Sequence, residues 1–250
     1  MKLFFSLLAL GMCASSLNAQ ASKLGDWPQH SRQRPLPAIV NPGPQKPQPA
    51  TAGAIVLFDG TALDTWMSAD SSAAKWKIID GAFEVVPGTG TMMTRAGFGD
   101  VHLHIEWMTP KPAEGNDQDR GNSGVFFGGG RYEVQVLDSY ANVTYADGQA
   151  GAIYGQYPPL KNAALPPGEW QTYDIIYHRP RFDAAGKLLK PAIISVTWNG
   201  IEVQKDRELV GPTANGSRPP YEAHADKLPI SLQDHGHKVR FRNAWLHEIE

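Results

Sequence analysis

Regularly spaced turn signals limit what this chain can fold into more than any other feature. The stretch "KWKIIDGAFEVV" places Asp80-Gly81 between two runs of β-branched and aromatic residues, and "AIISVTWNGIEVQKD" places Asn199-Gly200 in the same way. Dipeptides of this kind form the tight turns of β-hairpins, because both residues tolerate a positive φ angle. The pattern therefore predicts antiparallel hairpins.

Other short apolar runs extend the same pattern along the chain. No window of about a dozen residues has a sustained helical periodicity. Short strands at this spacing favour an all-β fold, an antiparallel β-sandwich, with a closed barrel as the alternative. Further strands are expected at residues 101–108, 123–127, 131–137, 170–178, 229–233 and 239–249.

The first 21 residues have the features of a signal peptide. Lys2 precedes an apolar run from Leu3 to Met12, and the segment ends in Ala19-Gln20-Ala21, which resembles a signal-peptidase site. The run is about half of the roughly 20 residues that a transmembrane helix needs, so no membrane span is expected. Met12 stands where a lipobox has a small residue, which argues against a lipid anchor on Cys13. We expect an exported protein, periplasmic or secreted.

Cysteine and charge content exclude several classes of function. Cys13 is the only cysteine, so removal of residues 1–21 leaves no disulfide, thiol nucleophile or thiolate metal ligand. The rest of the chain has 22 basic and 25 acidic residues and no basic stripe of the kind that binds nucleic acid. This balance suits an uncharged small-molecule ligand such as a sugar. Nothing in the sequence indicates an oligomeric state.

The chain divides into three segments by composition. Residues 22–52 are proline-rich, as in "RPLPAIVNPGPQKPQPA", and are expected to form an extended linker or a wrapping arm. The hydrophobic pattern then runs from "AIVLFDG" to the end without a second such segment. We expect a single domain over residues 53–250.

The strand "YEVQVLD" carries the first candidate site. Glu133 and Gln135 share one face, opposite Val134 and its neighbouring valine, and a one-residue bulge after Gln135 would bring Asp138 to the same face. The spacing resembles the Glu-x-Asp-x-x-Glu strand of retaining β-glucanases, in which two carboxylates do the chemistry. The alternative is an ordinary solvated face of an antiparallel strand.

Two other stretches, and one isolated arginine, carry polar groups that could work beside this strand. In "ISLQDHG", Gln233 lies on a strand and His235 beside a glycine turn, where an imidazole could transfer protons. In "DRGNSGVFF", Arg120 and Asn122 could bind hydroxyl or carbonyl oxygens, as could Arg95 further upstream. A structural loop histidine, an Asn-capped turn and a surface charge are the corresponding structural interpretations.

The stretch "DVHLHIEW" offers a possible metal site. His102, His104 and Glu106 alternate with apolar residues and project from one face of the expected strand, as metal ligands would. A solvated outer face explains the histidines equally well. No cofactor is required by the sequence, and a divalent cation stays open.

Together these stretches resemble the 3-keto-disaccharide hydrolase family, also described as 3-keto-glucoside 1,2-lyase and 3-keto-2-hydroxyglucal hydratase. The resemblance rests on "IVLFDGTALDTW", "WKIIDGAFEVV", "DVHLHIEW", "GNSGVFF", "YEVQVLD", "GEWQTYDI" and "ISLQDHGHKVRFRNAWLHEI", which occur in order from Ile55 to Glu250. Where the family often has arginines after "EW" and after the "NSGV-F" strand, this chain has Met108 and Gly128. Any substrate contacts made by those arginines are therefore missing from this chain.

The resemblance implies a jelly-roll sandwich of the concanavalin A type that acts on sugars oxidised at C3. A ketone at C3 acidifies the C2 proton, so a base can form an enolate that expels the group on C1, and water addition then completes net hydrolysis. The interpretation makes Glu133 or His235 the base, and Asp138 or Glu106 an acid or orienting group. It places the following residues in the groove: Glu106, Asn122, Glu133, Gln135, Asp138, Gln233 and His235.

Donors to the C3 oxygen are expected from Gln135, Asn122 and Arg120. Two other functions stay open from the sequence. A carbohydrate-binding module would use the same fold without catalysis. A retaining glycosidase on ordinary glycans would need two carboxyl groups about 5 Å apart.

Overall fold

Both hairpins expected from the turn dipeptides form. Asp80 and Gly81 have φ angles of 52° and 71°, and they join β4 (Lys77–Ile79) to β5 (Ala82–Glu84). Asn199 and Gly200 have φ angles of 51° and 77° and join β14 (Ile193–Trp198) to β15 (Ile201–Glu208). Positive φ at both central positions is the geometry in which the turn follows the twist of the strands.

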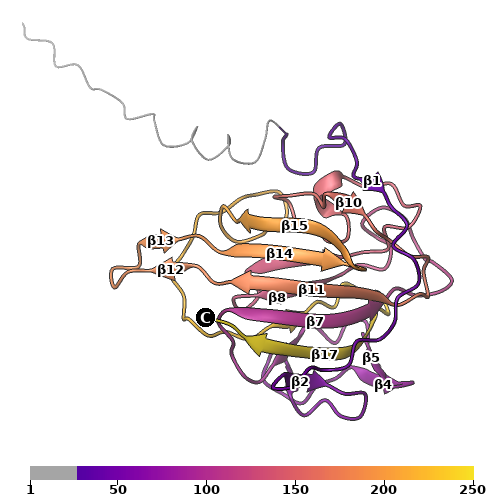
Figure 1. Cartoon of the computed structure of the whole chain (residues 1–250), viewed down its shortest axis with the longest axis horizontal. Helices are drawn as coiled ribbons and strands as arrows, with labels where there is room; N and C mark the ends of the chain where they lie inside the picture. The colour runs from indigo at the N-terminus through magenta and orange to yellow at the C-terminus, as the bar shows by residue number, and fades with distance from the viewer. Residues whose placement is uncertain (1–26) are drawn as a thin grey trace, which may run out of the picture.

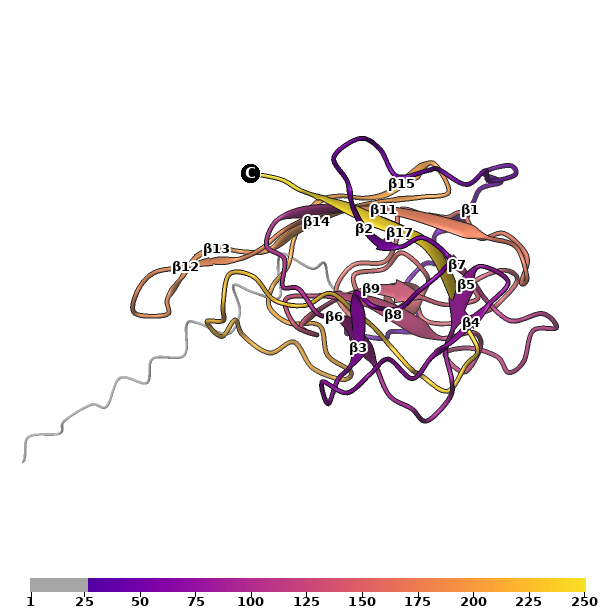
Figure 2. The same cartoon turned by 90° about the horizontal axis from the view of Figure 1, so that it is seen from below.

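The computed structural model describes residues 27–250, which form two antiparallel sheets stacked as layers (Figures 1 and 2). The predicted signal peptide and residues 22–26 lie outside this range. Within residues 27–250, no helix has the length and apolar character needed to cross a bilayer. The expected all-β sandwich is confirmed.

The larger sheet has eight strands in the order β15-β14-β11-β7-β17-β5-β4, with β2 paired to β17. Most of these strands lie side by side in Figure 1. The strands predicted at 101–108, 170–178 and 239–249 all belong to it. Their observed bounds, with that of β2, are β2 Ile55–Phe58, β7 Val101–Met108, β11 Gln171–His178 and β17 Arg240–Glu248.

The smaller sheet has five strands in the order β3-β6-β16-β8-β9 and forms the other layer in Figure 2. The strands expected at 123–127 and 131–137 are β8 and β9, whereas the strand expected at 229–233 has only two residues. The bounds are β3 Trp66–Ser68, β6 Met92–Thr94, β8 Ser123–Phe127, β9 Tyr132–Val136 and β16 Ser231–Leu232.

Five short elements complete the described chain. β12 (Arg181–Phe182) and β13 (Leu188–Lys190) form a hairpin that projects from the sandwich in both views. A single 3-10 turn, η1 (Ala146–Gly148), lies in the loop after β9. The remaining pair is parallel and joins the proline-rich segment to the domain, as described next.

Residues 27–52 follow the surface of the sandwich as an arm. β1 (Ala38–Ile39) pairs with β10 (Lys161–Asn162), and Gln48 accepts hydrogen bonds on its main-chain oxygen from Asn243 and Trp245. In Figure 1 the arm passes β10 at the upper right and descends to β2. The arm therefore runs from β10 to β17 of the larger sheet.

Aromatic side chains fill the space between the sheets. Trp66, Trp107 and Trp198 are at most 1% exposed, and Phe127 of the smaller sheet stacks on Tyr177 of the larger one with ring centroids 4.7 Å apart. Burial of this much apolar surface supplies the main driving force for folding.

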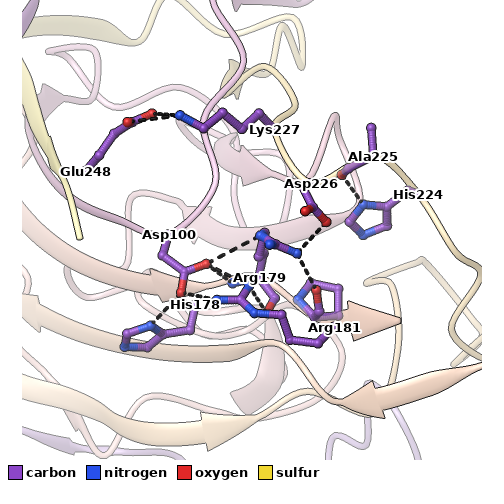
Figure 3. Close-up of polar contacts among 10 residues, drawn as sticks. Asp100, His178, Arg179, Arg181, His224, Ala225, Asp226, Lys227 and Glu248 are labelled. Carbon is purple, nitrogen blue, oxygen red and sulfur yellow. Dashed lines mark hydrogen bonds and ion pairs between the residues drawn. The ribbon is translucent and has the colours of Figure 1, made fainter. Parts of the chain in front are cut away.

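A charged cluster ties together three segments at one end of the larger sheet (Figure 3). Asp100, just before β7, accepts hydrogen bonds from both terminal nitrogens of Arg181 at 2.9 and 2.7 Å and from His178 at 3.1 Å. Arg179 bonds to Asp100 through its main-chain nitrogen and to Asp226 through its guanidinium. Asp100 is only 7% exposed.

Candidate functional site

The polar face of β9 is buried, although it points away from the core of the sandwich. Val134 and Val136 are fully buried on the core side, as expected. On the other side Glu133 is 6% exposed and Gln135 is 1% exposed. This face is therefore not an ordinary solvated face, because loops cover it.

A glycine leaves room for the Glu133 carboxyl group. Gly124 of β8 pairs with Gln135, and a β-carbon at Gly124 would lie 2.5 Å from Oε1 of Glu133. Any larger residue at this position would displace the carboxyl group. The "NSGV" glycine is thus explained by the close approach of the Glu133 carboxyl group.

Glu133 is the most strongly perturbed acidic group of the site. Burial raises its pKa to about 8. When the Gln135 amide nitrogen faces it, that nitrogen lies 2.9 Å from Oε1 of Glu133 and 2.9 Å from the main-chain oxygen of Ser123. A buried carboxyl with a pKa near neutrality is suited to proton transfer.

The loop of residues 117–122 connects the parts of the site. Gln118 donates to Oγ1 of Thr144 at 2.7 Å and to the main-chain oxygen of Gly148 at 2.9 Å. In the other orientation of the Gln135 amide, its Nε2 donates to Oε1 of Gln118 at 3.0 Å instead. The side chain of Asn122 donates to the main-chain oxygen of Gln118 at 2.8 Å. The Asn122 side chain therefore holds this loop in place.

Two tyrosines that sequence reasoning missed lie in the loop after β9. The hydroxyl groups of Tyr145 and Tyr154 are 2.8 Å apart, and the Tyr154 main-chain nitrogen donates to the main-chain oxygen of Glu133 at 3.3 Å. Burial raises the pKa of both phenols, and for Tyr154 the nearby Glu133 charge contributes. Both hydroxyls therefore stay protonated donors at neutral pH. Their only sequence signal is the tyrosine-rich, glycine-rich stretch "VTYADGQAGAIYGQY".

Asp138 lies beyond the end of β9 and binds Arg120. The pairing of β8 with β9 has no register shift, so the expected bulge is absent and the strand ends at Val136. Nε of Arg120 donates to Oδ2 of Asp138 at 2.8 Å. Burial raises the pKa of Asp138, and Arg120 opposes that rise. The pair lines a cavity of about 110 Å³ together with His237.

The turn after β16 presents His237 rather than His235 to the site. His235 is exposed, whereas Nε2 of His237 lies 3.2 Å from Asp119. The Gln233 main-chain nitrogen donates to the main-chain oxygen of Gly124 at 3.1 Å, so Gln233 lies next to the strand that faces Glu133. The side-chain Oε1 of Gln233 is buried. Arg95 is exposed and donates to the main-chain oxygen of Asp64. The structure thus does not bring His235 or Arg95 to Glu133.

Glu106 lies on the other sheet and does not join this group. On β7 it accepts hydrogen bonds from Arg242 at 2.7 Å and Asn243 at 2.8 Å. Burial alone would raise its pKa, but hydrogen bonds from His104, Asn243 and Arg242 lower it to about 2. His104 binds Asp174 at 2.9 Å. Among residues 27–250, no three His, Cys, Asp or Glu side chains are arranged to hold a metal ion.

Comparisons with known proteins identify the family of this chain. The model of the 3-keto-alpha-glucoside-1,2-lyase-like domain matches residues 53–247. A crystal structure from Parabacteroides distasonis ATCC 8503, of a protein provisionally assigned as a glycosyl hydrolase, is 41% identical, with a TM-score of 0.78 over 86% of this chain and 93% of that one. A second protein of that organism with the same assignment is 18% identical, covers 82% of this chain and 100% of its own, and has a TM-score of 0.59, which supports the fold alone.

The comparison with curated proteins gives no match. The family model covers most of the chain, and the match to the relative that is 41% identical spans 93% of that relative. Both point to an enzyme that acts on carbohydrates. The chain therefore belongs to the family of the 3-keto-alpha-glucoside-1,2-lyase-like domain.

Proposed function

We propose that this protein cleaves 3-keto-glycosides by elimination across C1 and C2, with Glu133 as the base. The observation that carries the proposal is the buried Glu133 carboxyl, whose pKa burial raises to about 8. A carboxylate in that state removes a carbon-bound proton more readily than one in water, because its basicity is close to the working pH. The family match supports the choice of substrate.

The proposed reaction balances without any redox partner. The Glu133 carboxylate takes the proton from C2, and the electron pair of that bond forms an enolate with the C3 ketone. The enolate then collapses, the bond from C1 to the glycosidic oxygen breaks, and the departing oxygen takes up the proton held by Glu133. The products are an alcohol and a 3-keto-2-hydroxyglucal, to which water can add in a hydration step.

Neutral hydrogen-bond donors near Glu133 would stabilise the enolate. The Tyr145 and Tyr154 hydroxyls stay protonated because burial raises their pKa, and the Gln135 amide lies 2.9 Å from Glu133. Preorganised donors of this kind commonly contribute about 3 kcal/mol to a transition state. Arg120, which binds Asp138, would orient the sugar from the adjacent cavity.

Gln135 also separates this proposal from a retaining glycosidase. That mechanism needs a second carboxylate as nucleophile. In this chain an amide, from Gln135, lies beside Glu133, and Asp138 is held by Arg120. Elimination needs one base and several donors, which is the composition of the site.

The test is turnover of chromogenic 3-keto-glucosides, beside the unoxidised parent glucosides, by residues 22–250. We expect release from the keto substrates alone, with a loss of at least about a hundredfold in Glu133→Gln, the scale of general-base contributions. Glu202→Gln, an exposed residue of β15, is the matched control and should match the wild type. Parallel assays with EDTA would measure the contribution of a divalent cation.

Turnover in D₂O distinguishes elimination from direct hydrolysis. Elimination followed by hydration places deuterium on C2 of the released sugar, whereas direct displacement at C1 leaves the C2 proton in place. Release without deuterium at C2 would contradict the proposed route. Sugar binding without release from any substrate would support a binding module instead.

The signal-peptide pattern of residues 1–21 supports the further proposal that the enzyme is exported. Its substrate would then be met outside the cytoplasm. Fractionation of cells that express the full chain, with detection of the mature protein in periplasm or medium, checks this.

A further inference from the structure

Residues 27–34 of the arm precede the region matched by the family model, yet they pack against the loops that contact Glu133. The main chain of Glu133 is held on both sides by loop residues. Its nitrogen donates to Oγ1 of Thr213 at 3.1 Å, and its oxygen accepts from the Tyr154 nitrogen. Thr213 and Tyr154 therefore mark the two loops that lie next to the candidate base, and the arm contacts both loops.

Gln29 contacts the neighbours of both loop positions. Its Nε2 donates to the main-chain oxygen of Ala214 at 2.6 Å. On the other loop, a β-carbon at Gly155 would lie 1.9 Å from the same nitrogen. The arm therefore bridges the two loops that hold Glu133, and Gly155 is the residue that permits this approach.

His30 follows Gln29 and packs against the tyrosine pair. Its ring centroid lies 4.1 Å from that of Tyr145 and 5.2 Å from that of Tyr154. Its main-chain nitrogen donates to Oδ2 of Asp147 at 3.1 Å. Burial lowers the pKa of the imidazole, opposed by Asp147, and so favours the neutral ring. Nε2 of His30 is buried and has no hydrogen-bond partner within residues 27–250.

Other polar atoms around His30 are also buried without a hydrogen-bond partner. Buried atoms without a partner in the described part of the chain are Oε1 of Gln29, Nη1 of Arg34, Oδ1 of Asp147 and Nη2 of Arg218. Buried polar groups are normally hydrogen-bonded, so such a concentration calls for an explanation. A sugar would provide one, because each of its hydroxyl groups both donates and accepts.

The arm is fixed along its length. Arg32 forms an ion pair with Asp117, and beyond it β1 pairs with β10. The Val40 nitrogen extends this pairing by donating to the oxygen of Asn162 at 2.9 Å. A segment anchored at several points can hold one side chain in a defined place.

We propose that residues 27–34 form one wall of the substrate site and that Nε2 of His30 binds a hydroxyl group of the sugar. This rests on the proposed function, because it assigns the sugar of the same site. The arm would then be part of the enzyme's binding machinery, contributed by a segment outside the family domain. His30 would govern affinity, whereas Glu133 governs the chemical step.

Two substitutions at His30 separate binding from packing. His30→Phe keeps an aromatic ring on Tyr145 but removes the nitrogen, whereas His30→Ala removes both. We expect each to raise KM for 3-keto-glucosides roughly tenfold, the scale of one lost hydrogen bond, with kcat changed less than about twofold. His30→Gln restores an amide donor and should recover part of the affinity. Melting temperatures would identify any variant that is misfolded.

His247→Ala is the matched control at the other end of the arm. Nε2 of His247 lies 2.7 Å from Oγ1 of Thr51, and this substitution should leave KM unchanged. A wild-type KM in His30→Phe would reduce His30 to a packing residue and overturn the proposal for the arm alone. Absence of turnover by the wild type on every 3-keto-glycoside would overturn the proposed function, and the sugar-binding role of His30 with it.

Discussion

At the scale of single residues, the ionisation of Glu133 opposes folding. A carboxyl group taken out of water without a charged partner favours its protonated form. Burial raises the pKa of Glu133 from an ordinary 4.5 to about 8. Between these two values the folded chain holds a proton that the unfolded chain has released. Raising the pH through this window therefore removes stability.

Replacement of Glu133 by Gln should make the protein more stable while abolishing turnover. The amide keeps the shape but cannot ionise, so its advantage over the wild type should grow by about 1 kcal/mol per pH unit between roughly pH 5 and pH 8. Urea unfolding of both proteins across this range measures the difference. The gain fits a site whose function opposes stability.

A comparison with Glu202→Gln guards against a general effect of removing a negative charge. That side chain is exposed on β15. Its variant should follow the pH dependence of the wild type. A constant stability difference between Glu133→Gln and the wild type at all pH values would contradict a raised pKa in the folded state.

At the scale of secondary-structure elements, β9 is positioned from behind by the opposite sheet. The hydroxyl of Tyr173, on β11, crosses the core and donates to the main-chain oxygen of Gln135 at 2.7 Å. Gly151 donates to the same oxygen from the loop. The strand that carries Glu133 and Gln135 is thus fixed by a buried contact between the two sheets.

Tyr173→Phe should lower the free energy of unfolding by about 1 kcal/mol, the usual net value of one hydrogen bond. We also expect kcat/KM to fall a few-fold, because β9 and the side chains of Glu133 and Gln135 can then shift. Tyr177→Phe is the matched control on the same strand. The Tyr177 hydroxyl is buried with no partner in the described chain, so its removal should be neutral or stabilising. Equal losses in both variants would contradict the positioning role.

Elements were more predictable than the site, for a physical reason. Strand positions and hairpin turns follow from local patterns, so β7, β8, β9 and both turns agree with the expectation. The proposed role of Glu133 depends on its burial, which the loop after β9 imposes. Gln118 and His30 contact this loop only through long-range packing, which leaves no periodic signal in the sequence. Glu106 has the right alternation but lies on the other sheet.

At the scale of the whole molecule, two features tie distant segments together. The arm links the face around Glu133 to β17, where Asn243 and Trp245 bind Gln48. At one end of the larger sheet, the cluster around Asp100 joins the start of β7, the end of β11 and the loop that contains Asp226 (Figure 3). Its cations are already bound by carboxylates, which makes it a structural tie.

Asp100→Asn should lower the free energy of unfolding by about 2 to 3 kcal/mol near pH 7, because it leaves Arg181 and Arg179 without their buried carboxylate. Burial raises the pKa of Asp100, but hydrogen bonds from Arg181, His178 and Arg179 outweigh this, and the pKa lies below its ordinary value. A lowered pKa contributes stability above the unfolded pKa of about 4 and loses it as the pH falls further. The difference between Asp100→Asn and the wild type should therefore shrink below about pH 4.

Asp226→Asn provides the contrast within the same cluster. Asp226 pairs with Arg179, but its side chain is 70% exposed, and exposed ion pairs contribute less than about 1 kcal/mol. Urea unfolding of the two variants at several pH values measures how much stability each carboxylate contributes, the buried one of Asp100 and the exposed one of Asp226. Equal effects would mean that the cluster is a surface network. A larger and pH-dependent loss in Asp100→Asn would identify the buried carboxylate as the group that holds β7, β11 and the loop together.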